Sequence, residues 1–199
     1  MAGRQTARTP GSGAGTRLEG LLLWAAITAL LAWAPWPPRL RPYLPSLWID
    51  LPLISLLLRR EPLTAWGVRR PDARQTAAHL TAFALLLLPA SLALLAALGA
   101  IQPRWDLHPG RLAATLGRQL LWVALPEELF FRGYLWARLR PQRPEDRLAA
   151  IAANGALFAL THLAIHPGPW AAATWLPGCY FAWLRCRTRN LLPPLLVHA

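Results

Sequence analysis

The chain has 199 residues, of which 55% are hydrophobic and 15% are charged, against about 25% charged residues in ordinary soluble domains. The net charge of +12 does not indicate nucleic-acid binding, because the arginines fall between apolar runs instead of forming one basic face. Eleven tryptophans fit a membrane protein, since tryptophan collects at the lipid–water interface. Cys179 and Cys186 lack CxxC spacing, which disfavours a disulfide framework or a zinc knuckle. We therefore expect an integral membrane protein.

Apolar runs divide the chain into a tail and a series of candidate membrane spans. Residues 1–17 predict a disordered N-terminal tail, residues 18–111 a first set of transmembrane helices and residues 112–199 a second set. About 20 apolar residues cross a hydrocarbon core of ~30 Å. The candidate spans are 18–36, 44–58, 77–101, 112–139, 149–165, 170–184 and 191–199. The predicted fold class is all-α, a polytopic transmembrane helical bundle of about six to seven spans.

The arginines predict the side of the membrane on which each connection lies. With the spans placed as above, alternate connections carry fifteen arginines on one side and four on the other. Cytoplasmic connections are enriched in basic residues, so we expect a cytoplasmic N-terminus, in a bacterial inner (plasma) membrane. The run 18–36 is long for the apolar part of a signal peptide and precedes no small-residue cleavage site, so we expect it to be retained as a span.

The stretch 126–134, Pro-Glu-Glu-Leu-Phe-Phe-Arg-Gly-Tyr, places charges inside an apolar run. An ionisable residue at membrane depth is a functional-site hypothesis by default. Glu128 and Arg132 are spaced i, i+4 and can form an intrahelical ion pair of mainly structural role. Glu127 is rotated by about 100° from Glu128, so we expect it to face another way and to need its own partner. Because a lone carboxylate in hydrocarbon is costly, a functional role is favoured for Glu127.

Two histidines are predicted near the depth of Glu127. Counting at the helical rise from the flanking arginines puts Glu127 about 16 Å, His162 about 22 Å and His198 about 13 Å from the cytoplasmic edge. Asn154, Phe158 and His162 follow an i, i+4, i+8 stripe on one helix face. Either histidine alone could be a core or a frayed terminal residue. A carboxylate and two imidazoles from three helices are better explained as one site.

These side chains are suited to hydrolysis by an activated water. A buried glutamate can act as a general base, one histidine can hold the water or protonate a leaving amine, and a further histidine or amide can stabilise an oxyanion. The chain has four serines and no GxSxG sequence, which disfavours a serine protease, and it has no HExxH sequence of a zincin. Two histidines and a glutamate could in principle bind zinc, so the ligand types leave a metal open.

Three motifs in chain order resemble those of one protease family. They are Glu127-Glu128-x-x-x-Arg132, Phe158-x-x-x-His162 and the late His198. This order resembles the CAAX protease and bacteriocin-processing (CPBP, Abi) family of intramembrane proteases, which includes the Rce1-type prenyl-protein endopeptidases. The resemblance covers about residues 112–199, which would be the catalytic helices. It implies a helical bundle with a water-accessible cavity inside the membrane.

The resemblance also implies a role for each residue. Glu127 would be the catalytic base, and Glu128 with Arg132 would orient the helix. His162 would assist the water or the leaving group, and His198 would stabilise the oxyanion. The implied mechanism is of the glutamate type, so we expect no cofactor and no metal.

One departure from the family concerns the end of the chain. The family's third motif is His-x-x-x-Asn or His-x-x-x-Asp, whereas His198 is followed only by Ala199. We expect that the sequence is truncated, that Asn154 substitutes from the face of His162, or that the protein is impaired. A seventh span of nine residues is too short to cross a bilayer, which favours truncation or a partly inserted end.

We predict an intramembrane endopeptidase that hydrolyses a peptide bond of a membrane-anchored protein or peptide. Candidate substrates are prenylated CAAX tails, bacteriocin leader peptides and C-terminal sorting tails like those cut by the related myxosortases, and the small arginine-rich chain makes a prenyl substrate the least favoured. The expected partners are membrane lipid and the membrane-anchored substrate, with no nucleic acid. The alternative is a non-catalytic bacteriocin-immunity or membrane scaffold protein that uses the same cavity.

Overall fold

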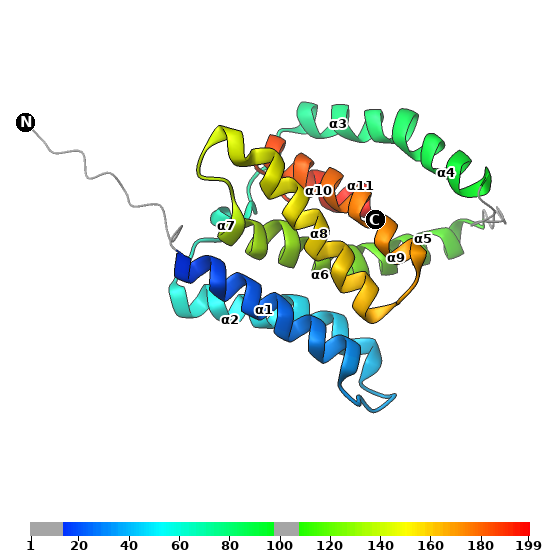
Figure 1. Ribbon diagram of the computed structural model, residues 1–199. Helices are drawn as coiled ribbons and strands as arrows, with labels where there is room; N and C mark the ends of the chain where they lie inside the picture. The colour runs from blue at the N-terminus through cyan, green and yellow to red at the C-terminus, as the bar shows by residue number, and fades with distance from the viewer. Residues whose placement is uncertain (1–13, 98–107) are drawn as a thin grey trace, which may run out of the picture.

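The computed structural model describes residues 14–97 and 108–199, and these form an all-α bundle (Figure 1). Within these ranges the elements are helical and no strand occurs, which confirms the predicted fold class. Residues 1–13 of the predicted tail lie outside the described residues, as do residues 98–107, which include the end of the predicted span 77–101.

Three helices of the described ranges are long and apolar enough to cross a membrane. They are α1 (Ala14–Trp33), the stretch Ala73–Ala93 and the stretch Pro144–Ile165. The second stretch contains α3 (Ala73–Ala82), the π-helical η3 (Phe83–Leu87) and part of α4 (Leu88–Ala97), and the third contains η6 (Pro144–Asp146) and α8 (Arg147–Ile165). Three of the predicted spans therefore meet the requirement by length and composition.

The other predicted spans are helical but are shorter or contain more charged residues. They correspond to α2 (Leu47–Arg59), to the continuous helix 109–139, to α9 (Pro169–Ala173) with α10 (Trp175–Thr188), and to α11 (Leu192–His198). The short 3-10 segments η1 (Arg41–Ser46) and η2 (Leu63–Trp66) belong to the connections on either side of α2.

The predicted tail 1–17 ends too late. Helix α1 begins at Ala14, so residues 14–17 are helical. The physical reason is a tertiary contact in the second turn, because Glu19 accepts a hydrogen bond from Ser55 of α2 at 2.7 Å and pairs with Arg59. These contacts anchor the beginning of α1 against α2.

The long helix 109–139 contains the acidic stretch and alternates between α and π geometry. It comprises α5 (Pro109–Arg118), the π-helical η4 (Gln119–Ala124), α6 (Leu125–Glu128), the π-helical η5 (Leu129–Leu135) and α7 (Trp136–Leu139). Pro126 has no N–H with which to continue the regular ladder, and the preceding N–H, that of Leu125, bonds to Leu120 five residues back. The two glutamates therefore lie in a single α turn between two π-helical segments, which are frequent at functional sites.

Aromatic packing on the long helix forms the main core. The ring of Trp48 in α2 lies 4.5 Å from that of Phe130 and 5.3 Å from that of Phe131, measured between centroids. Trp66 meets Tyr134 edge-on at 5.6 Å. These buried rings attach α2 and η2 to η5, each pair adding to the stabilisation that comes from apolar burial.

Figure 1 shows α8, α10 and α11 across the middle of the bundle, α1 and α2 on one side, and α3 and α4 on the other. Helices α8 and α10 are in close contact at two glycines, because a Cβ on Gly178 would lie 3.1 Å from the Cα of Gly155. Small residues allow helix backbones to approach in this way. The start of α1 and the end of α7 lie at one end of the bundle, where the connections are rich in arginine (Figure 1).

Candidate active site

Glu128 and Arg132 form a fully buried ion pair inside the long helix. Nη1 of Arg132 donates to Oε1 of Glu128 at 2.9 Å, and neither side chain is more than 1% exposed. Nη2 of Arg132 donates to the carbonyl of Gly178 in α10 at 2.9 Å, and its guanidinium carbon lies 4.5 Å from the ring centre of Phe158. The predicted i, i+4 pair is thus present. It also joins three helices, and these contacts offset the desolvation of its charges.

His198, in the last turn of α11, contacts both glutamates. Its Nδ1 lies 2.9 Å from Oε1 of Glu128, and its Nε2 lies 3.7 Å from Oε2 of Glu127. An ionised carboxylate only accepts hydrogen bonds, so Nδ1 of the imidazole carries the donated hydrogen. We call Glu127, Glu128, Arg132 and His198 the Arg132 cluster.

The prediction that Glu127 needs a partner of its own is wrong. Both carboxylates meet the same imidazole. The rotation of about 100° between adjacent residues holds along one helix, but it does not limit what a side chain from another helix can reach. The ring of His198 has a nitrogen on each of two edges, so it can bridge neighbouring residues of the long helix.

Two aromatic rings hold the imidazole of His198. Phe181 of α10 stacks on it with centroids 4.8 Å apart and an interplanar angle of 19°. Phe158 of α8 meets it edge-on at 6.0 Å. Stacking on one face and edge contact on another restrict the ring plane, so both nitrogens stay directed at the glutamates.

His162 lies one turn after Phe158 on α8. Its Nδ1 lies 2.9 Å from the carbonyl oxygen of Phe158, and the two rings are 4.4 Å apart. A carbonyl accepts, so Nδ1 donates and Nε2 is left for another partner. The ring of Phe158 contacts His162 and also meets His198 at 6.0 Å, and Nε2 of His198 lies 3.7 Å from Oε2 of Glu127. The structure therefore brings all three predicted catalytic residues into one region.

Asn154 is fully buried, and its Nδ2 donates to the carbonyl of Phe131 at 2.9 Å. Phe131 lies in η5, and its carbonyl also receives the N–H of Trp136 five residues later. Asn154 therefore connects α8 to the long helix one residue before Arg132. This hydrogen bond gives Asn154 a positioning contact. That Asn154 also takes the place of the amide that the family has after its last histidine stays a prediction.

Sequence reasoning missed Arg185 and Gly178. Arg185 follows the predicted span 170–184 directly, in a connection between predicted spans. It is only 6% exposed, and its Nε donates to the carbonyl of Arg132 at 2.9 Å. Gly178 supplies the carbonyl that accepts from Nη2 of Arg132. No spacing in the sequence signals these contacts, because both come from α10 and depend on where that helix crosses η5.

A second charged cluster on the same helix was also missed. Nη1 of Arg138 donates to Oε2 of Glu61 at 2.8 Å, and its guanidinium carbon lies 4.1 Å from the ring centre of Tyr134. The hydroxyl of Tyr134 donates to Glu19 at 3.0 Å, and Arg59 also pairs with Glu19. We call these five residues the Arg138 cluster. It joins the N-terminal helices to the helix that carries Glu127.

Glu127, His162 and His198 are residue types that can bind zinc. Within the part of the chain that the structure describes, no three His, Cys, Asp or Glu side chains are grouped so that they could hold a metal ion. Nδ1 of His198 is engaged by Glu128, which is itself paired with Arg132. The expectation that the protein uses no cofactor stays a prediction.

The fold and the site define a membrane helical bundle with a buried constellation of glutamates and histidines. Residues 109–199 match the family model described as type II CAAX prenyl endopeptidase Rce1-like. This match confirms, over residues 109–199, the resemblance drawn from the motifs, while a myxosortase-like character stays a prediction. Comparison with the curated proteins and with the solved structures finds no match.

Proposed function

We propose that this chain is an intramembrane endopeptidase that hydrolyses a peptide bond of a membrane-anchored protein or peptide. The observation that carries the proposal is the approach of Glu127 and His198, whose side chains are 18% and 12% exposed and whose atoms Oε2 and Nε2 are 3.7 Å apart. Oε2 of Glu127 makes no hydrogen bond to any described residue. The Rce1-like domain supports the proposal, because that family consists of proteases.

The separation of 3.7 Å suits a shared water. A polar pair at such a distance can be bridged by a water at ordinary hydrogen-bond length from both atoms. In the proposed reaction Glu127 accepts a proton from this water while the water oxygen attacks the scissile carbonyl carbon. The carbonyl electron pair moves to its oxygen and returns as the C–N bond breaks. The proton held by Glu127 passes to the amide nitrogen, so the products are a carboxylic acid and an amine.

The histidines have separate tasks in this reaction. Glu128, paired with Arg132, holds Nδ1 of His198 and so directs Nε2 to the reacting atoms. When Nε2 also carries a proton it can donate to the developing oxyanion, a type of contact worth about 10²- to 10³-fold in turnover. His162, with Nδ1 held by Phe158, can present Nε2 to the water or to the leaving amine. Glu128 and Arg132 are therefore positioning residues.

The test uses the purified full chain in proteoliposomes with fluorogenic peptides. The family description supplies the first substrate, a peptide ending in a prenylated CAAX sequence; the same peptide without the prenyl group, a leader peptide and a C-terminal sorting peptide are the other arms. We expect cleavage of at least one of them, and a fall of about 10²- to 10⁴-fold in turnover for Glu127→Gln.

His162→Ala is expected to lower turnover by about 10²-fold or more, because it removes the imidazole that assists the water or the leaving amine. The matched control is Glu145→Gln, which removes an exposed carboxylate from η6 and should leave turnover unchanged. Helical circular dichroism and the melting temperature show whether each variant is folded. Full turnover in both Glu127→Gln and His162→Ala would contradict the proposal. Tight peptide binding without cleavage by the unsubstituted chain would favour the non-catalytic alternative.

A further inference from the structure

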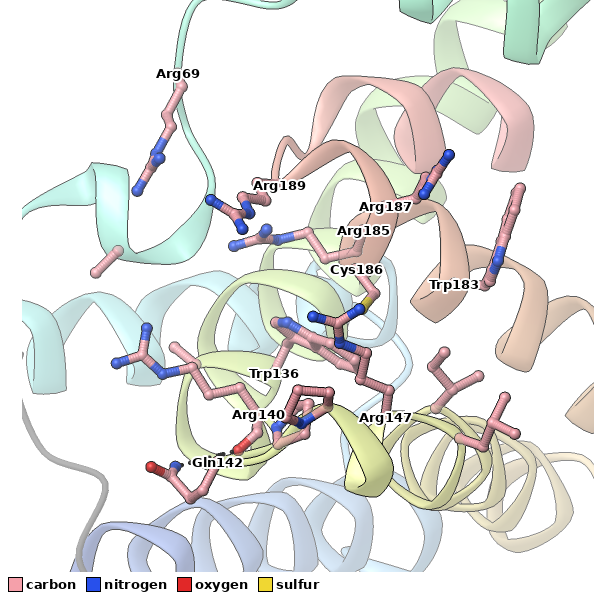
Figure 2. A pocket seen from close by; sticks show the side chains of 16 residues that line it. Arg69, Trp136, Arg140, Gln142, Arg147, Trp183, Arg185, Cys186, Arg187 and Arg189 are labelled. Atoms are coloured by element: carbon pink, nitrogen blue, oxygen red, sulfur yellow. Dashed lines mark hydrogen bonds between the residues drawn. The ribbon is translucent and has the colours of Figure 1, made fainter.

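A cavity of about 780 Å³ opens at the arginine-rich end of the bundle, and none of the Arg132 cluster lines it. It lies between the end of α7, the start of α8, the end of α10 and the connection that follows η2 (Figure 2). Its lining contains no aspartate and no glutamate. The basic residues that line it are Arg69, Arg140, Arg147, Arg185, Arg187 and Arg189.

Among the described residues, no carboxylate pairs with the arginines that line this cavity. The ion pairs among the described residues involve Arg59, Arg132 and Arg138, and none of the six lining arginines. Arg185 is only 6% exposed, and the charges of Arg69 and Arg140 repel its guanidinium. Figure 2 shows the side chains of Arg185 and Arg189 extending toward the segment that carries Arg69. An anion in the cavity would offset this repulsion and the desolvation of Arg185.

The position of the cavity indicates where the anion comes from. Its lining residues lie at the ends of α7, α8 and α10, where candidate membrane helices meet the connections to which the sequence assigns fifteen of its arginines. Trp136 and Trp183 also line it. Arginine and tryptophan at the ends of spans lie at the depth of lipid headgroups, and basic pockets between helices on the cytoplasmic side bind phosphate headgroups.

We propose that this cavity binds the phosphate group in the headgroup of an anionic membrane lipid. A guanidinium presents two parallel N–H groups to two phosphate oxygens, and several arginines around one space favour a group of high charge density. The hydrogen bond from Nε of Arg185 to the backbone carbonyl of Arg132 connects the cavity to the Arg132 cluster. The proposal does not depend on hydrolytic activity.

The test compares lipids on the purified full chain in detergent, by native mass spectrometry and by thermal unfolding. Phosphatidic acid is expected to remain bound and to raise the melting temperature, whereas zwitterionic phosphatidylcholine is expected to do neither. The cavity variant Arg140→Gln/Arg147→Gln is expected to bind phosphatidic acid about tenfold more weakly. The control Arg74→Gln/Arg143→Gln removes the same charge at exposed positions outside the lining, and should change affinity less than about twofold by screening at the surface.

Inorganic phosphate forms a separate arm. If it binds as tightly as phosphatidic acid, and less tightly to the cavity variant, the site is a phosphate site supplied from solution. Equal affinity of the cavity and control variants, or equal binding of the two lipids, overturns the proposal. Each single substitution repeats the comparison with an expected effect of about threefold to fivefold if the double variant does not fold. Glu127→Gln is expected to bind phosphatidic acid normally, so failure of the proposed hydrolysis would leave this result unaffected.

Discussion

Two clusters on the long helix use a buried arginine–glutamate pair in different ways. In the Arg138 cluster, Arg138 lies 2.8 Å from Glu61 and 3.6 Å from Glu19, and Glu19 also accepts from Ser55 and Tyr134. In the Arg132 cluster, Arg132 and His198 both contact the same oxygen, Oε1 of Glu128. The partners are thus spread over several carboxylate oxygens in one cluster and concentrated on one oxygen in the other.

The two clusters differ in the carboxylate oxygens that are left without a hydrogen bond. Oε2 of Glu127 and Oε2 of Glu128 are buried without a hydrogen bond to a described residue, whereas no carboxylate oxygen of the Arg138 cluster is in that state. The Nε of Arg132 and the Nε of Arg138 both lack a partner among the described residues, so the clusters differ at their carboxylates. A buried polar atom without a partner costs about 1–3 kcal/mol. Oε2 of Glu127 is the atom that accepts a proton from water in the proposed reaction, so this cost has a functional reason there. Oε2 of Glu128 bears the same cost within the positioning pair.

The strongest test of the comparison is Arg132→Gln. It leaves the buried Glu128 without its charged partner, and we expect the free energy of unfolding to fall by about 3–5 kcal/mol. Chemical denaturation in detergent, followed by circular dichroism, measures this change. The double variant Glu128→Gln/Arg132→Gln should recover most of the stability, because no buried charge is left unpaired. It should still be inactive, because Nδ1 of His198 loses its charged acceptor. An Arg132→Gln variant as stable as the unsubstituted chain would contradict the assignment.

Gly155→Ala tests whether the site depends on the close approach of α8 and α10. A Cβ there would lie 2.5 Å from Sγ and 2.9 Å from the backbone nitrogen of Cys179. Because a backbone atom cannot move aside cheaply, we expect a loss of about 3 kcal/mol, the upper part of the usual range for overpacking. The control is Gly117→Ala in α5, where no atom lies within 4 Å and alanine should stabilise the helix by up to about 1 kcal/mol. Thermal unfolding of both variants measures the contrast.

Arg138→Gln tests the other half of the comparison. It removes the cation that donates to Glu61 and lies 3.6 Å from Glu19, two residues whose side chains are 11% and 24% exposed. Water reaches these carboxylates better than Glu128, so we expect a smaller loss of about 2 kcal/mol. Turnover per folded molecule should change less than about threefold, within the range expected for a residue outside the chemistry. A loss of turnover as large as that of Glu127→Gln, in a folded variant, would show that the two clusters do not have separate roles.

Asn154→Ala is expected to have the smallest effect. It removes the bond to the carbonyl of Phe131, and a single hydrogen bond contributes about 1 kcal/mol. If Asn154 only positions α8, turnover should fall less than about tenfold. A fall of about 10²- to 10³-fold, the effect of removing an oxyanion donor, would instead assign Asn154 the role of the amide that the family has after its last histidine. Steady-state kinetics and thermal unfolding on the same preparation separate the two results.

Several features of this protein follow from the sequence alone. The all-α class follows from composition and from the lengths of the apolar runs, both of which are local properties. The pair Glu128–Arg132 follows from i, i+4 spacing on one helix. The resemblance to an Rce1-like domain follows from three motifs whose order needs no tertiary information, and the match over residues 109–199 confirms that resemblance.

The tertiary structure decided the contacts between helices. It placed one imidazole, that of His198, against two adjacent glutamates, and it brought Arg185 to the carbonyl of Arg132 and Glu61 to Arg138. Rise and rotation per residue relate side chains on a single helix. They do not say where two helices cross, which depends here on the close contact of Gly155 and Gly178. For that reason the sequence could name Glu127, His162 and His198 as candidates, whereas the contacts of Arg185 and Gly178 with Arg132, and the atoms that meet, were decided only by the packed bundle.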